Sequence, residues 1–375
     1  MAQPRDFGFG EEQQMLKDAS RKFMEDKQPL VTLRKQIAGS EDPYLGKERT
    51  GGFDQAAWKE MVQLGWSALA VPEKDGGAGM DLVTAVAVME EIGRSAMPTP
   101  LTSTLHATFV LREAGTVEAS AWLRKIAQGK SATLAIFGAD GSLGSDSTDV
   151  AADEQGLTGT SYFIQDLQKA DFLVVAAVNA DGVGLYCIET EGEGVTREFD
   201  RIVDLTRDQG RVSFSAAEAD CVAPANLGAQ ALHKAMPALL TLVAADIAGG
   251  CEWLLQTTAE YARIRTQFDR PIGFFQAVKH PIVNMMIATD ETRSLVYNAA
   301  CAYDTDPDDA DRCARLAKSS ASDTAEFCAN RGTQLHGGIG FTWEADVQIY
   351  HKRQIHSQYL FGDGVWHRQK LAEQL

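Results

Sequence analysis

The sequence predicts an α+β protein with a mainly helical N-terminal domain, a middle antiparallel β domain and a C-terminal helical bundle. Three observations support this fold class. Apolar residues recur at helical spacing in the first third of the chain, alternate or form short runs in the middle, and return to helical spacing after Asn226. Gly, Asn and Asp turns separate the middle segments. No internal repeat or low-complexity linker divides the chain, so the three parts are expected to pack into one body.

Three amphipathic segments predict helices in the N-terminal zone. Residues 11–26 (EEQQMLKDASRKFMED), 53–65 (FDQAAWKEMVQLG) and 81–93 (DLVTAVAVMEEIG) place apolar side chains three and four positions apart. A Gly or Pro stops each segment at or soon after its end. Residues 1–128 are therefore expected to form a helical domain.

The middle zone, residues 129–225, is expected to form the β domain. Its hydrophobic period changes to two, or to short apolar runs, in the segments ATLAIFG, TGTSYFIQD, ADFLVVAAV, GVGLYCIE and GRVSFSA. The Gly, Asn and Asp residues between these segments are typical of turns.

Residues 226–375 return to helical periods and are expected to form the C-terminal helical domain. The acidic loop DTDPDDAD and the glycines of TQLHGGIGFTWEADVQIYHKR interrupt these periods. The longest apolar run, residues 235–255, is long enough to cross a membrane, but it contains Pro237, Asp246 and Glu252, which are costly in hydrocarbon. We interpret it as a buried helix.

Composition excludes several classes of function. The 375 residues are 45% hydrophobic, which is enough to bury a sizeable core. A formal net charge of -17, with no basic stripe to offset it, argues against nucleic acid and anionic membranes as partners. The six cysteines form no C-x-x-C pair and no secretory leader opens the chain, so a reducing cytoplasm is expected.

Four segments of the chain resemble the acyl-CoA dehydrogenase family. They are VPEKDGGAGMD and MEEIGR before the predicted strands, and YARIRTQFDRPIGFFQAVKH and QLHGGIGFTWEADVQIYHKR after them. The likeness runs almost from end to end. It implies an α-β-α architecture, FAD as cofactor, a tetramer, and oxidation of the Cα–Cβ bond of an acyl-CoA thioester, with electrons passed to an electron-transferring flavoprotein.

The matched residues suit the nucleotide part of FAD. Arg265 can bridge two phosphate oxygens, while Gln267 and Phe268 can hold the adenosine end. Gly337 and Gly338 have no Cβ, so a phosphate or an adenine can lie against their amides. Gln334 can add a side-chain hydrogen bond. In the family, these segments and a Gln that matches Gln276 reach across a dimer interface to the neighbour's FAD.

The resemblance also exposes what this chain lacks. Removal of the α-proton of a thioester requires a base over the substrate, opposite the flavin. Most family members carry a Glu in a Tyr-Glu-Gly pattern, where this chain has Phe361 in QYLFGDGVWHR. The second family position for the Glu matches Leu239, and Leu240 follows where an Arg is usual. Neither Phe nor Leu can accept a proton.

The flavin-facing segments of the β domain also differ from the family. The usual Gly-Ser-Asp loop and Trp-bearing hairpin are replaced by FGADGSLGSD and GLTGTSYFIQD. Most of the hydroxyls and the Trp that cradle the flavin ring are therefore missing. Asp269 replaces a Gly at a turn, a change that Asp tolerates because it accepts left-handed conformations.

Two acids remain as candidate bases. Asp246 follows Leu239 by seven residues, roughly 10 Å along a helix, and either acts in place of the Glu or pairs with a Lys or Arg between helices. Asp363 lies on the correct loop, two positions past the Glu site, and either acts as the base or caps the next helix. The histidines His336, His351 and His367 show no metal-ligand spacing, so no metal is expected.

These observations lead to one hypothesis and two alternatives. The chain retains residues for a neighbour's FAD and lacks those for its own flavin and substrate. It therefore looks like the subunit without the Glu in the α2β2 acyl-CoA dehydrogenases of bacterial steroid side-chain degradation, a branch of lipid metabolism. The alternatives are a self-sufficient homotetrameric dehydrogenase that uses a displaced acid such as Asp363, and a redox-inactive scaffold with the same fold.

Overall fold

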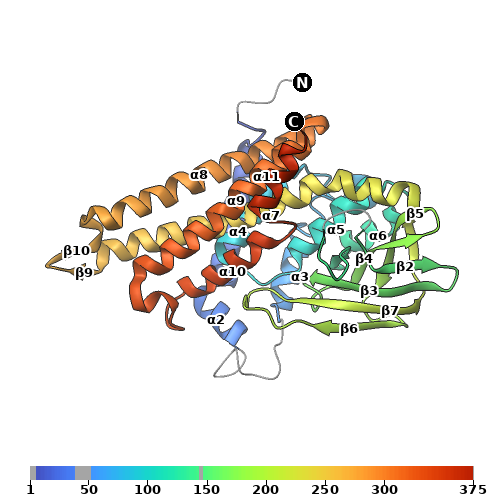
Figure 1. The fold of residues 1–375 in the computed structure, drawn as a ribbon, viewed down its shortest axis with the longest axis horizontal. Helices are drawn as coiled ribbons and strands as arrows, with labels where there is room; N and C mark the ends of the chain where they lie inside the picture. Colours follow the sequence, from blue (N-terminus) through green and yellow to red (C-terminus); the bar gives the residue numbers. More distant parts are fainter. Residues whose placement is uncertain (1–5, 39–51, 143–146, 375) are drawn as a thin grey trace.

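The computed structural model describes residues 6–38, 52–142 and 147–374. Helices precede and follow a β sheet along the chain, as the sequence predicts (Figure 1). The N-terminal helices are α1 (Glu11–Lys27), α2 (Leu30–Ala38), α3 (Gln55–Gln63), α4 (Leu82–Ser95), α5 (Leu101–Ala114) and α6 (Val117–Ala127), with the 3-10 turn η1 (Glu73–Asp75). The C-terminal helices are α7 (Ala225–Ile264), α8 (Gln276–Thr305), α9 (Pro307–His336), α10 (Val347–Tyr359) and α11 (Gly364–Ala372), with η2 (Ile272–Phe274) and η3 (Gly337–Phe341).

The middle of the chain forms one sheet, and its strand directions differ in part from the prediction. The strands are β1 (Ala132–Ala135), β2 (Val150–Asp153), β3 (Gly156–Gln165), β4 (Phe172–Asn179), β5 (Gly182–Glu189), β6 (Val195–Phe199), β7 (Gln209–Ala217) and β8 (Asp220–Ala223). The order is β6-β7-β3-β2-β4-β5-β8, with β1 beside β4. Because β4 pairs in parallel with β1 and β2, the sheet is mixed, not purely antiparallel. Hydrophobic alternation marks a strand but does not specify the direction of its neighbour.

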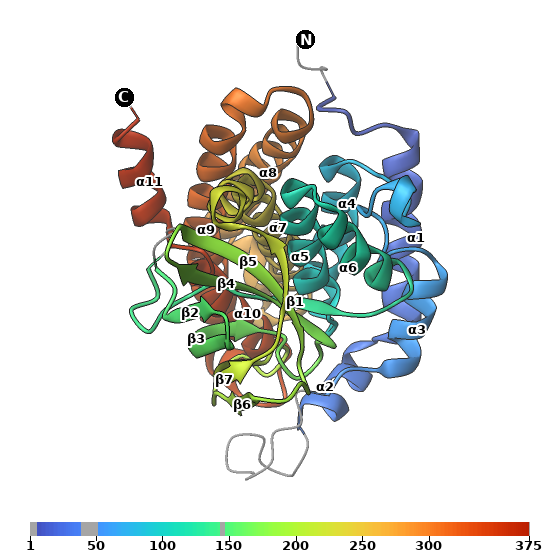
Figure 2. The same ribbon diagram turned by 90° about the vertical axis from the view of Figure 1, so that its right-hand side faces the viewer.

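The sheet separates two hydrophobic cores, and β4 shows this most clearly. Phe172, Val174 and Ala176 of β4 belong to the main core, which the sheet shares with the helices. The alternate residues Leu173 and Val175, together with Ala177, belong to a smaller core on the other face. This period of two is that of a strand buried on both faces. Figure 2 shows the sheet packed at one end of the helices.

Helix α7 is the central element of the helical part. It packs against α4, α5, α8, α9 and α10, and it also contacts β5. By length and composition α7 could cross a membrane, but 89% of its most apolar window is buried inside the protein. This burial confirms the interpretation of residues 235–255 as a core helix. The predicted three-domain division is not itself tested by these contacts and stays a prediction.

Two glycines allow α4 and α7 to cross at very short distance. A Cβ placed on Gly93 of α4 would overlap the backbone oxygen of Asp246 of α7. A Cβ on Gly249 of α7 would overlap the backbone oxygen of Glu90 of α4. Each helix therefore needs a residue without a side chain where it meets the other, and this requirement explains the Gly of the MEEIGR segment.

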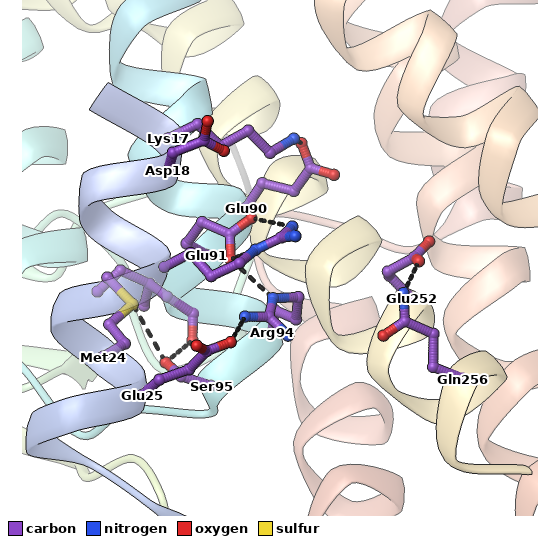
Figure 3. A network of polar contacts seen from close by, with 12 residues as sticks. Lys17, Asp18, Met24, Glu25, Glu90, Glu91, Arg94, Ser95, Glu252 and Gln256 are labelled. Atoms are coloured by element: carbon purple, nitrogen blue, oxygen red, sulfur yellow. Dashed lines mark hydrogen bonds and ion pairs between the residues drawn. The ribbon is translucent and has the colours of Figure 1, made fainter. Parts of the chain in front are cut away.

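The two glutamates of MEEIGR join α1 to the helical core. Glu90 and Glu91 are buried, and both are fully engaged in ion pairs. Glu90 accepts from Lys17 of α1 and from Arg293 and Tyr297 of α8. Glu91 binds Arg21 of α1 and Arg94, whose other nitrogen reaches Glu25 of α1 (Figure 3). Buried charges need such partners, so these contacts fix how α1 lies on α4.

The α4–α7 crossing leads to a stability prediction. We expect Gly249→Ala to lower the free energy of unfolding by about 3 kcal/mol, because the added methyl group must push two helix backbones apart. Urea unfolding followed by circular dichroism measures this change. Gly338→Ala is the matched control, since a Cβ at Gly338 meets nothing within 4 Å. Equal stability of the two variants would contradict the close crossing.

Candidate functional site

Residues predicted to bind a nucleotide lie at the outer end of the helical bundle. Arg265 is the C-cap of α7, and Gln267 and Phe268 belong to the hairpin of β9 (Thr266–Gln267) and β10 (Arg270–Pro271) that follows it (Figure 1). Phe268 is 85% exposed. Asp269, at the turn, takes the left-handed conformation expected of it, with a φ of 60°.

The other predicted nucleotide residues reach the same end from two further helices. Gln276 opens α8, Gln334 lies in the last turn of α9, and the two glycines begin η3. Tyr261 of α7 stacks on His336 of α9, with ring centroids 4.4 Å apart, and so holds these helix ends together. A Cβ at Gly337 or Gly338 would meet nothing within 4 Å, so the backbone there is open to a ligand.

This end of the bundle has the donor set that a dinucleotide needs. It offers a guanidinium for a diphosphate, side-chain amides for the ribose or base, an aromatic ring and bare glycine backbone. The same residues are exposed, so this chain supplies only one wall of such a site. A nucleotide held here would need a second chain to cover it.

A separate cavity of about 580 Å³ lies between the sheet and the loop that joins α10 to α11. This volume falls within the range of small-molecule pockets. Aromatic and polar residues share its lining: Phe137, Ser142, Phe163, Gln165, Gln209, His356, Tyr359, Phe361, Asp363 and Trp366. Two of the segments that depart from the family pattern therefore meet here. Residues 143–146 of the first lie outside the described residues.

Phe361 forms the inner wall of this cavity. Its side chain is buried, with an edge-to-face contact to His106 of α5 at 5.4 Å between ring centroids. Its ring also packs against Phe137, 5.7 Å away. The residue at the expected Glu position thus joins three parts of the chain through apolar contacts. It offers no group that accepts a proton.

The second expected Glu position is apolar as well. Leu239 and Leu240 are both fully buried in α7, within the main core. A carboxylate at either place would lack water and the partners that a buried charge requires. Phe361 and Leu239, at the two positions expected for the Glu, therefore both lack a group that accepts a proton.

Asp246 is held in a buried ion cluster and does not face the cavity. Its Oδ2 lies 2.6 Å from Nη2 of Arg207, and Oδ1 pairs with Arg353 of α10. Arg353 also donates to the hydroxyl of Thr206 at 2.8 Å. Burial alone would raise the pKa of Asp246, but Arg207 and Arg353 hold it below its ordinary value. The expected ion-pair role is the one observed.

Asp363 caps α11. Its Oδ1 accepts from the backbone N–H of Trp366 at 2.8 Å, the geometry of an N-cap side chain. Asp363 also lines the cavity, so one carboxylate oxygen is committed to the helix while the residue borders the pocket. The capping role expected for this residue is confirmed, and its role as a base stays a prediction.

The sequence did not reveal two other buried charged groups near the cavity. Lys169 binds Asp166 at 2.7 Å and Asp208 at 2.6 Å beneath the sheet. Lys318 of α9 is fully buried and donates to the backbone of the cavity loop. A signal for Lys318 was present, because it interrupts an apolar stripe at helical spacing. That stripe consists of Ala314, Ala317, Ala321 and Ala325.

Three histidines lie around the cavity loop in their neutral form; His106 and His367 are buried, and His356 is partly buried. Burial lowers the pKa of His106 to about 4, and the same effect lowers that of His356 to about 4. Burial and the nearby Lys318 lower the pKa of His367 to about 3. Among the residues that the structure describes, no group of three or more His, Cys, Asp or Glu side chains is arranged to hold a metal ion.

Comparison with known proteins places this geometry in a family. Residues 10–130 match the acyl-CoA dehydrogenase N-terminal domain, and residues 228–375 match the acyl-CoA dehydrogenase C-terminal domain. The acyl-CoA dehydrogenase IpdE2 of Mycobacterium tuberculosis is 34% identical over 305 residues, which cover 80% of this chain and 81% of that protein. The chain belongs to the acyl-CoA dehydrogenase family. The resemblance identified from the sequence is confirmed at this level, and the family supports FAD as the expected cofactor.

Solved acyl-CoA dehydrogenase structures share the whole fold. A variant of the Tcur3481-Tcur3483 steroid ACAD has a TM-score of 0.86 at 28% identity, covering 97% of this chain and 98% of that one. The ChsE4-ChsE5 complex of Mycobacterium tuberculosis has a TM-score of 0.86 at 25% identity, with 98% of each chain covered. Both names describe a pair of proteins or a complex.

The buried cluster around Asp246 leads to a second stability prediction. We expect Asp246→Asn to lower the free energy of unfolding by about 4 kcal/mol, because two buried guanidinium groups lose the carboxylate that bridges them and keep only Asp204, 3.6 Å from Arg207. Asp323→Asn is the matched control, since Asp323 pairs with Arg368 at the surface and should cost at most about 1 kcal/mol. Urea unfolding of both variants decides the matter. A loss of the same size in each would contradict the assigned role.

The buried histidines predict that the protein loses stability in acid. Folding lowers the pKa values of these three histidines, so below about pH 6.5 the unfolded chain binds more protons than the folded chain. The free energy of unfolding therefore decreases as the pH is lowered. Between pH 7 and pH 5 we expect a loss of about 2 kcal/mol per histidine. Urea unfolding across this range measures it, and His356→Gln should remove about one proton from the slope. Stability independent of pH would rule out neutral burial.

Proposed function

We propose that this chain is the subunit without a catalytic base in a heterotetrameric acyl-CoA dehydrogenase. In this role it completes the FAD site of a homologous catalytic chain, which removes the α-proton of an acyl-CoA thioester. The observation that carries the proposal is an asymmetry within one molecule. The nucleotide-binding end keeps its donor set, whereas Phe361 and Leu239 stand at both positions of the base.

The distance between the two ends supports the need for a partner. Arg265 follows Asp246 by 19 residues of α7, roughly 28 Å along the helix axis. Arg207, the partner of Asp246, contacts Ser357, which is next to the cavity-lining His356. The nucleotide-binding end and the cavity of one chain thus lie too far apart to enclose the same small group. Two chains placed side by side can supply one end each.

The residues at the outer end fit the adenosine and diphosphate parts of FAD. Arg265 would bind the diphosphate, Phe268 would cover the adenosine, and Gln334 with the Gly337–Gly338 backbone would hold the remaining polar atoms. FAD supplies the acceptor for the hydride that leaves the β-carbon of the substrate. Exposed apolar side chains near this end, including Ile264, Phe274 and Ile287, would be covered by the second chain.

The relatives support a substrate class for the assembled enzyme. The named likeness to a steroid ACAD supports a steroid side-chain CoA thioester as the substrate of the assembled enzyme. The chain's likeness to one member of the ChsE4-ChsE5 complex supports a homologous partner subunit. An electron-transferring flavoprotein is proposed as the acceptor. We also propose that the complex is cytoplasmic, as expected from the cysteine pattern of this chain.

Copurification tests the proposal. We expect the purified lone chain to retain little flavin and to show no acyl-CoA oxidation, while the chain expressed with a catalytic homologue gains both. Arg265→Ala in this chain should weaken FAD retention by the complex at least tenfold, because the diphosphate loses its guanidinium. Arg263→Ala is the matched control, since Arg263 is exposed on the same helix and pairs with Glu260. Full flavin loading and turnover by the lone chain would refute the proposal.

A further inference from the structure

The loop that joins α10 to α11, residues 360–363, and the last turn of α10 are held by hydrogen bonds to their backbone carbonyls. Nζ of the buried Lys318 donates to the carbonyls of Gln358 at 2.8 Å and Gly362 at 2.7 Å, and to the hydroxyl of Ser322 at 2.8 Å. His367 of α11 binds the carbonyl of Phe361 through Nε2 at 3.0 Å. The loop is therefore fixed from both α9 and α11.

This anchoring holds Phe361 in an unusual conformation. Its φ of 56° lies in the left-handed region, which a bulky side chain adopts only when its surroundings impose it. In that conformation the ring points away from solvent, between His106 of α5 and Phe137. The ring is part of the lining of the 580 Å³ cavity. A flexible loop would allow the ring to move out of this position, but hydrogen bonds from Lys318 of α9 and His367 of α11 restrain this loop.

We propose that Phe361 is a plug that closes this chain's own cavity to an acyl chain, and that Lys318 is the positioning residue that holds the plug in place. This inference rests on the proposed function, since it explains why only the partner's sites would take substrate. A loss of the base alone would leave a site that still binds thioester and withholds it from the catalytic chain. A fixed aromatic ring prevents such binding of thioester in this chain's own cavity.

A binding experiment on the purified full chain tests the plug. The probe is butyryl-pantetheine, a thioester without a nucleotide, so its binding needs no partner chain, flavin or base. We expect Phe361→Ala to bind the probe at least tenfold more tightly than the wild type in isothermal titration calorimetry. Phe199→Ala, at an exposed Phe of β6 outside the cavity lining, is the matched control and should bind as the wild type does.

Equal affinity of Phe361→Ala and the wild type, whether both bind or neither does, would overturn the plug. Phe361→Leu replaces the alanine variant if that variant does not fold. Because flavin and partner take no part in this measurement, its result is independent of the copurification test. The inference can therefore fail while the proposed function stands, and the reverse also holds.

Hydrogen exchange tests the role of Lys318. The amide of Gly362 donates to the carbonyl of Tyr359, so its exchange reports opening of the loop. We expect Lys318→Met to raise this exchange at least tenfold at pH 6, while Lys370→Met, at an exposed Lys of α11 paired with Glu373, leaves it unchanged. Equal protection in the wild type and Lys318→Met would remove Lys318 from the proposal.

The pH profile of this exchange separates positioning from simple packing. Burial lowers the pKa of Lys318 to about 7, against the opposing effect of Asp363. Above this pH the amine loses its charge and keeps two N–H groups for three acceptors, so its hydrogen bonds to the carbonyls of Gln358 and Gly362 weaken. Two other neighbours keep their charge state in this range. The guanidinium of Arg315 on α9 stays charged, and His367 on α11 stays neutral because its pKa is lowered to about 3. After correction for the intrinsic pH dependence of amide exchange, the exchange rate of Gly362 should rise from pH 6 to pH 8 in the wild type and stay constant in Lys318→Met. A constant rate in the wild type would overturn the positioning role of Lys318.

Discussion

The buried ion cluster of Asp246, Arg207 and Arg353 is the constraint on which the rest of the structure depends. It joins α7, the segment before β7 and α10, so it links the helical bundle to the sheet. None of its members is more than slightly exposed, and a buried charge without its partner is far more costly than a missing surface pair. The close contact between Gly93 of α4 and the backbone carbonyl of Asp246 fixes the position of the turn of α7 that carries Asp246. The cavity loop then follows directly from α10.

Much of the fold was accessible from the sequence, because periodicity depends on local burial. Three of the N-terminal helices, the helical C-terminal zone and five of the strands were found, and the family resemblance predicted Leu239 and Phe361 at the two positions of the base. The capping role of Asp363 also followed from its place before a helix. The parallel pairings of β4 did not follow, since alternation carries no direction. The partners of Asp246 were equally hidden, because Arg207 and Arg353 lie 39 and 107 residues away.

The same limit explains which residues the sequence singled out and which it did not. Arg265, Gln267 and the Gly337–Gly338 pair were recognised because they belong to short local motifs. Lys318 was missed, although a lysine among buried alanines is unusual and signals a specific set of acceptors. Its acceptors are backbone carbonyls of a loop some forty residues later, and backbone atoms leave no trace in a sequence.

The arrangement around Phe361 argues against gradual decay of an unused active site. A site that had merely lost its base would be expected to keep a polar, hydrated pocket or to loosen its loop, because nothing would then hold the backbone in a strained conformation. Here the loop keeps a left-handed residue, a buried lysine with three acceptors, and a capped helix that follows it. The left-handed residue and the buried lysine each cost free energy, which the hydrogen bonds to the loop and the apolar contacts of the ring offset. If Phe361 is the plug that we propose, these polar contacts serve to hold its ring in place.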